Sequence, residues 1–190
     1  VLLRGEDMTG WEPNRRPVNT VFQSYALFPH MNVAKNIGYG LRLKKTPREE
    51  IRRRVDEMLG LVQLPGFGAR MPNQLSGGQR QALTLLMATM VPPKLLLLDE
   101  HTAALDPATA EKVLALTTEI VAEHGLTCLM ITHNMRDAIN YGNRLIMMDA
   151  GRVVVDISGE EKKKLTVPDL LALFSSASGS TEANDKLLLS

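Results

Sequence analysis

Two adjacent carboxylates follow the most apolar run of the sequence. Residues 95–98 are four leucines, the pattern of a strand buried on both faces, and Asp99 and Glu100 come directly after them. Folds of the α/β class bind ligands at the carboxyl ends of such strands. One acid there can hold Mg²⁺ and the other can orient or deprotonate an attacking water, which is the chemistry of phosphoryl transfer. The alternative is an acidic strand end that only caps the following turn.

A hydroxyl and two glycines precede a second apolar segment. Ser76, Gly77, Gly78 and Gln79 stand immediately before a run with helical spacing. A helix that begins there directs its unpaired backbone amides and its positive end to one point, which attracts phosphate. The alternative interpretation is a serine N-cap followed by flexible glycines.

The elements that must position these groups form an α/β pattern. Short strands are expected within residues 1–22 and helices between residues 24 and 92, one of them amphipathic around residues 51–62. From Lys94 onward strands and helices alternate. We expect strands at 95–98 and 126–131, a helix entered through Asp106-Pro107 and ending near Glu123, a short helix at 133–141, and a hairpin of 145–148 with 153–155. The small polar residues 175–180 predict a frayed or disordered tail.

Composition narrows the class of protein. The 190 residues are 44% hydrophobic and 23% charged, with a net charge of +1, which excludes disordered, collagen-like and disulfide-stapled chains. The near-zero charge also argues against non-specific nucleic-acid binding. The single cysteine, Cys128, stands in an apolar run and is interpreted as a buried thiol. No apolar stretch approaches the roughly 18 residues that span a bilayer, so any membrane role requires a partner.

Five motifs, in their order and spacing, resemble the nucleotide-binding subunit of an importer-type ATP-binding-cassette (ABC) transporter. The resemblance covers roughly residues 1–165 and implies an α/β fold: a partial P-loop NTPase core with an inserted helical subdomain. The motifs are Val21-Phe22-Gln23 with the Tyr-Ala-Leu-Phe-Pro-His of residues 25–30, Ser76 to Gln79, the Asp99-Glu100 strand end, Ala104-Leu105-Asp106, and Thr132-His133.

The resemblance implies a role for each motif residue, with ATP and Mg²⁺ as cofactors. Asp99 and Gln23 would associate with Mg²⁺, Glu100 would be the general base, and His133 would bridge the γ-phosphate and that base. By itself, His133 would more simply be a capping or core histidine. Four residues would form a signature that contacts the ATP of a second ATPase subunit, in a homodimer or heterodimer: Ser76, Gly77, Gly78 and Gln79. Asp106 would contact that second subunit.

The resemblance also implies a domain organisation and partners. Residues 1–23 would begin the ATPase core, 24–93 would form the helical subdomain, 94–165 would complete the α/β core, and 166–190 would form a C-terminal helix and tail. Transmembrane permease subunits would dock near residues 25–39, at the cytoplasmic face of the inner membrane, with no nucleic-acid partner. The expected function is ATP hydrolysis coupled to import of a polyamine or similar small solute.

One expected motif does not occur in the sequence. The phosphate loop G-x-x-x-x-G-K-[ST], which cradles the β- and γ-phosphates, is absent from the 190 residues. We therefore expect an N-terminal truncation, weak ATP binding, and an aggregation-prone or marginally stable chain with exposed strand edges. The alternative is a truncated, non-catalytic interaction module. A DNA-repair or translation ATPase of the same superfamily would require coiled coils or a second cassette, and neither pattern is present.

Two departures from the family pattern accompany the missing loop. His101 stands where most relatives have proline after the catalytic glutamate, and we expect no catalytic role for it. The chain up to Gln79 resembles polyamine-type importer ATPases, whereas residues 82–161 resemble another importer branch. A join at the shared Ser-Gly-Gly-Gln-Arg-Gln, natural or artificial, would explain the difference.

Overall fold

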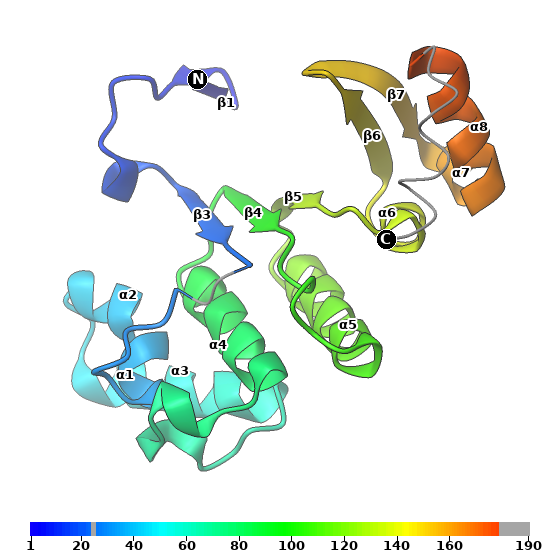
Figure 1. Cartoon of the computed structure of the whole chain (residues 1–190). Coiled ribbons are helices and arrows are strands. Elements are labelled where there is room, and N and C mark those ends of the chain that lie inside the picture. The colour runs from blue at the N-terminus through cyan, green and yellow to red at the C-terminus, as the bar shows by residue number, and fades with distance from the viewer. Residues whose placement is uncertain (24–25, 179–190) are drawn as a thin grey trace. The chain divides into compact units, whose positions relative to one another are not determined.

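The computed structural model describes residues 1–23 and 26–178, which form two compact units (Figure 1). Unit 1 runs from Val1 to Ile131 and unit 2 begins at Thr132. Each unit has its own hydrophobic core, so each is described separately. Tyr25, which belongs to the expected docking segment, and residues 179–180 of the expected tail lie outside the described residues.

The centre of unit 1 is a parallel sheet. Strands β3 (Val18–Val21), β4 (Leu95–Asp99) and β5 (Thr127–Ile131) lie in the order β3-β4-β5 (Figure 1). The register pairs Val21 with Leu98 and Asp99 with Ile131, so the carboxyl ends of the three strands share one edge. This parallel arrangement confirms the α/β fold class.

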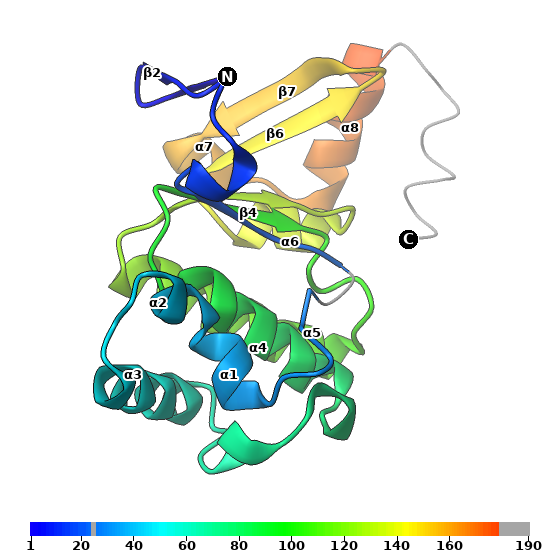
Figure 2. The ribbon, with the colours of Figure 1, turned by 90° about the vertical axis from the view of Figure 1, so that its left-hand side faces the viewer.

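Two helices cover one face of this sheet. Helix α4 (Gly77–Thr89) and helix α5 (Pro107–Glu123) lie side by side there (Figure 2). Because side chains alternate along a strand, Leu96 and Leu98 point to this face and are fully buried. Cys128 is half-buried against the same core, and burial raises the pKa of its thiol to about 11.

Three further helices precede α4 in the chain. They are α1 (Val33–Ile37), α2 (Tyr39–Leu43) and the amphipathic α3 (Arg48–Leu61), followed by the 3-10 turns η2 (Phe67–Ala69) and η3 (Pro72–Gln74). Val55 and Leu59 bury the apolar stripe of α3, and α1 packs on α4. At the N-terminus, β1 (Leu2–Leu3) pairs antiparallel with β2 (Glu6–Asp7), ahead of the 3-10 turn η1 (Pro13–Arg15).

Unit 2 is a hairpin packed against a helix. Strands β6 (Arg144–Asp149) and β7 (Arg152–Ser158) pair antiparallel through a turn in which Ala150 and Gly151 both have positive φ. Such a pair of left-handed residues matches the twist of the two strands. Leu145, Ile157 and Leu170 share the core. The helices of the unit are α6 (Met135–Asn140), α7 (Gly159–Lys163) and α8 (Val167–Ser178).

The C-terminal helix extends further than the sequence predicted. An irregular tail was expected from residue 175, but α8 continues through Ser178. Ser176 is compatible with the helix because a serine hydroxyl can bond to a backbone carbonyl one turn earlier. The Ser176 hydroxyl donates such a bond to the carbonyl of Leu173 at 2.9 Å.

Candidate functional site

The Asp99-Glu100 pair stands at the carboxyl end of the central strand. Asp99 is the last residue of β4, and Glu100 begins the turn that leads to α5. Glu100 has a φ of 45°, in the left-handed region that residues with a Cβ seldom adopt. Its amide donates to the carbonyl of Ile131 on β5 at 3.0 Å, and its carbonyl accepts from the amide of Ala103 at 3.0 Å. These two bonds hold the backbone of the predicted base on both sides.

Gln23 follows the neighbouring strand at the same edge of the sheet. It stands two residues beyond Val21, the last residue of β3, and Val21 pairs with Leu98 on β4. Its side chain is exposed. The topology thus places Gln23 and Asp99 after two adjacent parallel strands, the arrangement in which α/β sheets bind ligands.

Ser76 begins α4 through a reciprocal capping pattern. Its hydroxyl accepts from the amide of Gln79 at 3.3 Å, and the Gln79 side-chain oxygen accepts from the amide of Ser76 at 3.0 Å. These bonds satisfy one of the first amides of the helix and the amide of its cap. The amides of Gly77 and Gly78 are the remaining donors of the first turn, and such donors at the positive end of a 13-residue helix suit an anion.

Gly78 and Asp106 come together through Thr109. A Cβ on Gly78 would lie 2.2 Å from Cγ2 of Thr109, so any other residue there would require the Thr109 side chain or the helix to shift. Asp106 caps that turn by accepting from the amide of Thr109 at 3.1 Å. Hydrogen bonds from Thr109 hold the pKa of the Asp106 carboxyl below its usual range. The sequence analysis did not identify Thr109, because its contact with Gly78 exists only once α4 and α5 pack together.

His133 belongs to unit 2 and is described within it. It is exposed and precedes Asn134, whose side chain caps α6 by accepting from the amides of Arg136 at 2.9 Å and Asp137 at 3.2 Å. Burial raises the pKa of Asp137, and the charge of His133 offsets part of that rise. The predicted role of His133 beside Glu100 therefore stays a prediction.

The residues at the sheet edge suit Mg²⁺ by their chemistry. Mg²⁺ prefers oxygen ligands and is commonly held by one or two carboxylates together with phosphate oxygens and water. The Asp99 carboxylate and the Gln23 amide oxygen are such donors. Within the described ranges no three His, Cys, Asp or Glu side chains gather as a metal site. The first turn of α4 offers backbone donors that suit an anion, whereas the 190 residues contain no G-x-x-x-x-G-K-[ST] loop.

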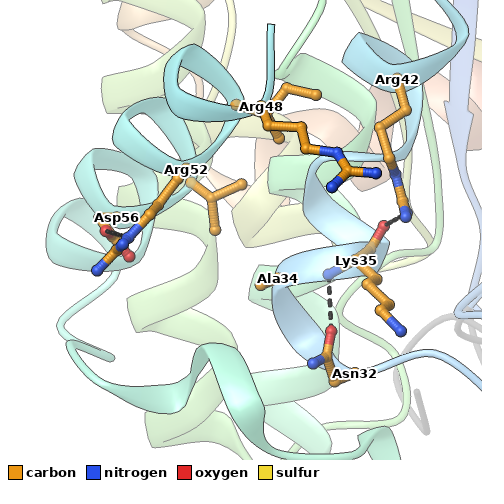
Figure 3. A pocket seen from close by; sticks show the side chains of 9 residues that line it. Asn32, Ala34, Lys35, Arg42, Arg48, Arg52 and Asp56 are labelled. Carbon is orange, nitrogen blue, oxygen red and sulfur yellow. Dashed lines mark hydrogen bonds and ion pairs between the residues drawn. The ribbon is translucent and has the colours of Figure 1, made fainter.

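A groove lies among helices α1, α2 and α3 of unit 1 (Figure 3). Its volume is about 230 Å³, and Ala34, Ile51 and Val55 give it an apolar lining. Its charged lining residues are Lys35, Arg42, Arg48, Arg52 and Asp56, four cations and one carboxylate. Asp56 pairs with Arg52 at 3.9 Å. The groove is therefore cationic, and α1 within it falls inside the expected docking segment.

Arg48 is a cation of this groove that no described carboxylate neutralises. Among the described residues no carboxylate lies within ion-pair distance of its guanidinium, whereas Arg42 donates to the backbone carbonyl of Lys35. Figure 3 shows the guanidinium groups of Arg42 and Arg48 directed to the same side of the groove.

In the part of the chain that the structure describes, no helix combines the length and apolarity that crossing a membrane requires.

Comparisons with known proteins agree with these observations. The profile of the ABC transporter family matches residues 1–103. The putrescine transport ATP-binding protein PotG of Escherichia coli (strain K12) is 45% identical over 154 residues, which are 81% of this chain and 41% of PotG. The spermidine/putrescine import ATP-binding protein PotA of Thermobifida fusca (strain YX) is 47% identical over 153 residues, 80% of this chain and 40% of PotA.

A third relative shows the same extent of similarity. PotA of Haemophilus influenzae (strain ATCC 51907 / DSM 11121 / KW20 / Rd) is 41% identical over 161 residues, 85% of this chain and 43% of the relative. The chain thus spans about two fifths of the length of these relatives. Since the family profile matches more than half of the chain, the protein belongs to the ABC transporter family.

Proposed function

We propose that this chain is the ATP-binding subunit of an ABC importer and takes part in ATP hydrolysis that drives import of a polyamine or similar small solute. The observation that carries the proposal is the Asp99-Glu100 pair at the carboxyl end of the central parallel strand, in a unit that also contains the capped start of α4. The names of the relatives, which concern putrescine and spermidine, support the substrate class.

Each site residue has a defined task in this proposal. Asp99 and Gln23 hold Mg²⁺, which when bound neutralises charge on the phosphates. Glu100 accepts the proton of the attacking water, and His133 orients that water and the terminal phosphate. The amino end of α4 binds the γ-phosphate of ATP held by a second ATPase subunit, and Asp106 lies at that subunit boundary. The α4 residues are Ser76, Gly77, Gly78 and Gln79.

The partners follow from the same assignment. A second ATPase subunit, identical or related, completes the phosphate site. Transmembrane permease subunits dock on the helical part of unit 1, where the cationic groove and α1 offer a charged and apolar surface. The subunit is then peripheral, on the cytoplasmic face of the inner membrane, and touches the membrane only through these partners.

A second candidate function is a non-catalytic interaction module. It is supported by the sequence itself, which contains no G-x-x-x-x-G-K-[ST] motif to cradle the β-phosphate. In this alternative the 190 residues dock or dimerise but do not turn over ATP by themselves. We propose that the isolated chain is inactive in either case.

Mg-ATP binding and hydrolysis distinguish the two candidates. The 190-residue chain is compared with an extended chain, in which a segment that contains a G-x-x-x-x-G-K-[ST] loop precedes Val1. The ATPase proposal expects the extended chain alone to hydrolyse ATP. No hydrolysis by either chain, with ATP-independent dimerisation, supports the interaction module. Hydrolysis by the 190-residue chain would contradict the proposed need for the loop.

A further inference from the structure

His101 is buried in the turn that follows the Asp99-Glu100 pair. Only 3% of its surface is exposed, and its Nε2 lies 3.2 Å from the hydroxyl of Thr117, which is itself buried in α5. The Thr117 hydroxyl donates its single proton to the carbonyl of Val113 at 2.7 Å. Thr117 must therefore accept from His101, which places the imidazole proton on Nε2.

The hydrogen bond of His101 links two elements of unit 1. With its proton on Nε2, the ring donates to the hydroxyl of Thr117 at 3.2 Å. This bond joins the turn after β4 to α5 at a residue three turns into the helix.

The hydrogen bond between His101 and Thr117 lies next to the strained backbone of Glu100. Glu100 has a φ of 45°, which a residue with a Cβ adopts only when its surroundings hold it there. The amide of Glu100 donates a hydrogen bond to Ile131 on β5, and the carbonyl of Glu100 accepts one from Ala103 in the turn itself. His101, the residue directly after Glu100, adds a hydrogen bond to α5.

We propose that His101 is a positioning residue, whose hydrogen bond to Thr117 fixes the turn that aims the Glu100 carboxylate. The inference rests on the proposed function, in which Glu100 accepts a proton from water. A histidine that only fills space would leave the orientation of Glu100 unchanged when its hydrogen bond is removed. The two roles therefore differ in an observable property of Glu100.

Nuclear magnetic resonance of the full 190-residue chain provides the test without any nucleotide. The substitution Thr117→Val removes the acceptor and keeps the shape of the side chain. Thr118→Val is the matched control, because Thr118 is the next residue and its hydroxyl, among the described residues, bonds to the carbonyl of Leu114 at 2.9 Å and not to His101. The readouts are the ¹⁵N shifts of the His101 ring and the ¹³C shift of the Glu100 carboxylate at pH 7.

We expect the native chain to show a proton on Nε2 of His101. Thr117→Val should shift the Glu100 carboxylate resonance and produce a mixture of ring tautomers, whereas Thr118→Val should leave both at their native values. His101→Gln, whose amide can donate in place of Nε2, should restore the Glu100 resonance that His101→Leu displaces. An unchanged Glu100 resonance in Thr117→Val, or a proton on Nδ1 in the native chain, would overturn the proposal.

Measurements of kcat and KM separate this proposal from the proposed function. In the extended chain Thr117→Val should lower kcat roughly ten- to hundredfold and leave KM unchanged, because misaimed catalytic groups slow chemistry more than binding. If Glu100→Gln leaves hydrolysis unaffected, the proposed function fails while the resonance test of His101 still stands. If Glu100→Gln abolishes hydrolysis and Thr117→Val does not change kcat, the positioning role alone is wrong.

Discussion

Gly78 and Thr109 are in such close contact that a Cβ on the glycine would lie 2.2 Å from Cγ2 of the threonine. This contact joins the first turn of α4 to the first turn of α5. It therefore sets the spacing between the Ser76 cap and the Asp106 cap. Two motifs that are about thirty residues apart in the sequence become one surface because glycine lacks a side chain at this position.

Replacing Gly78 with alanine should destabilise the protein, although alanine favours helices. The clash with Thr109 should cost about 1–3 kcal/mol of the free energy of unfolding, more than the gain in helix propensity of up to about 1 kcal/mol. Urea denaturation measures the difference. The double variant Gly78→Ala/Thr109→Ser, which removes Cγ2, should recover most of the loss.

Gly60 is the matched control for this substitution. It lies in α3 with an ordinary helical backbone, and a Cβ there meets no atom within 4 Å. Gly60→Ala should therefore stabilise the protein by up to about 1 kcal/mol. Equal effects at Gly60 and Gly78 would show that the contact with Thr109 is unimportant.

Acid should destabilise the native chain through His101. The pKa of His101 is about 4 when folded, against an ordinary value of 6.5, because burial disfavours the charged ring. Between these values the unfolded chain binds a proton that the folded chain does not bind, so the free energy of unfolding falls as the pH falls from 6.5 to 4. The loss at pH 4 should be of the order of 3 kcal/mol.

Urea denaturation at several pH values checks this sign and size. His101→Gln cannot titrate, so its stability should fall less steeply over the same window. The carboxylates whose pKa values are lowered, such as Asp106, contribute equally to both proteins. The same slope in the native chain and His101→Gln would contradict the assignment.

The edge of β5 should promote association of the chain. In the described part of the chain β5 pairs only with β4, and it exposes 51% of Leu129 and 53% of Ile131. An unpaired, apolar strand edge is a template for pairing with another chain. Leu129→Lys should therefore increase the monomeric fraction in analytical ultracentrifugation without loss of cooperative unfolding.

Leu43 provides the comparison, since it is 69% exposed but ends a helix rather than lying on a strand. Leu43→Lys should leave the association unchanged. If both lysine variants reduced association equally, general surface hydrophobicity would be the cause, and the strand edge would have no special part.

If permease subunits dock on the helical part of unit 1, as proposed, reversing the charge of Arg48 should weaken that docking. Arg48 lines the cationic groove, and an acidic residue in its place repels a partner that carries carboxylates. We expect about a tenfold increase in Kd for Arg48→Glu at low salt and a smaller effect at high salt. Lys112→Glu on α5, with the same change of charge, should retain native affinity for membranes that contain the permease subunits.

The sequence predicted most elements because their ends carry strong local signals. Asp106-Pro107 predicts the start of α5, which begins at Pro107, and the run of leucines predicts β4. The reversal at Ala150 and Gly151 was expected from the turn residues between two apolar runs. These features depend on a few neighbouring residues, so a single sequence suffices to find them.

Features that depend on packing could not be predicted in the same way. The burial of His101, the left-handed backbone of Glu100 and the contact of Gly78 with Thr109 all arise from residues brought together by the fold. The extension of α8 to Ser178 likewise depends on its burial through Leu170 rather than on its polar end. A histidine directly after an acidic pair was the one available signal for the buried turn.

Hydrolysis by the extended chain tests the central claim most directly. Glu100→Gln removes the proposed base with almost no change in shape, and should lower kcat by roughly 10²- to 10⁴-fold while Mg-ATP still binds. Glu111→Gln, an exposed glutamate on α5, should keep the rate of the unsubstituted extended chain. Equal rates in Glu100→Gln and Glu111→Gln would contradict the assignment of Glu100 as the base.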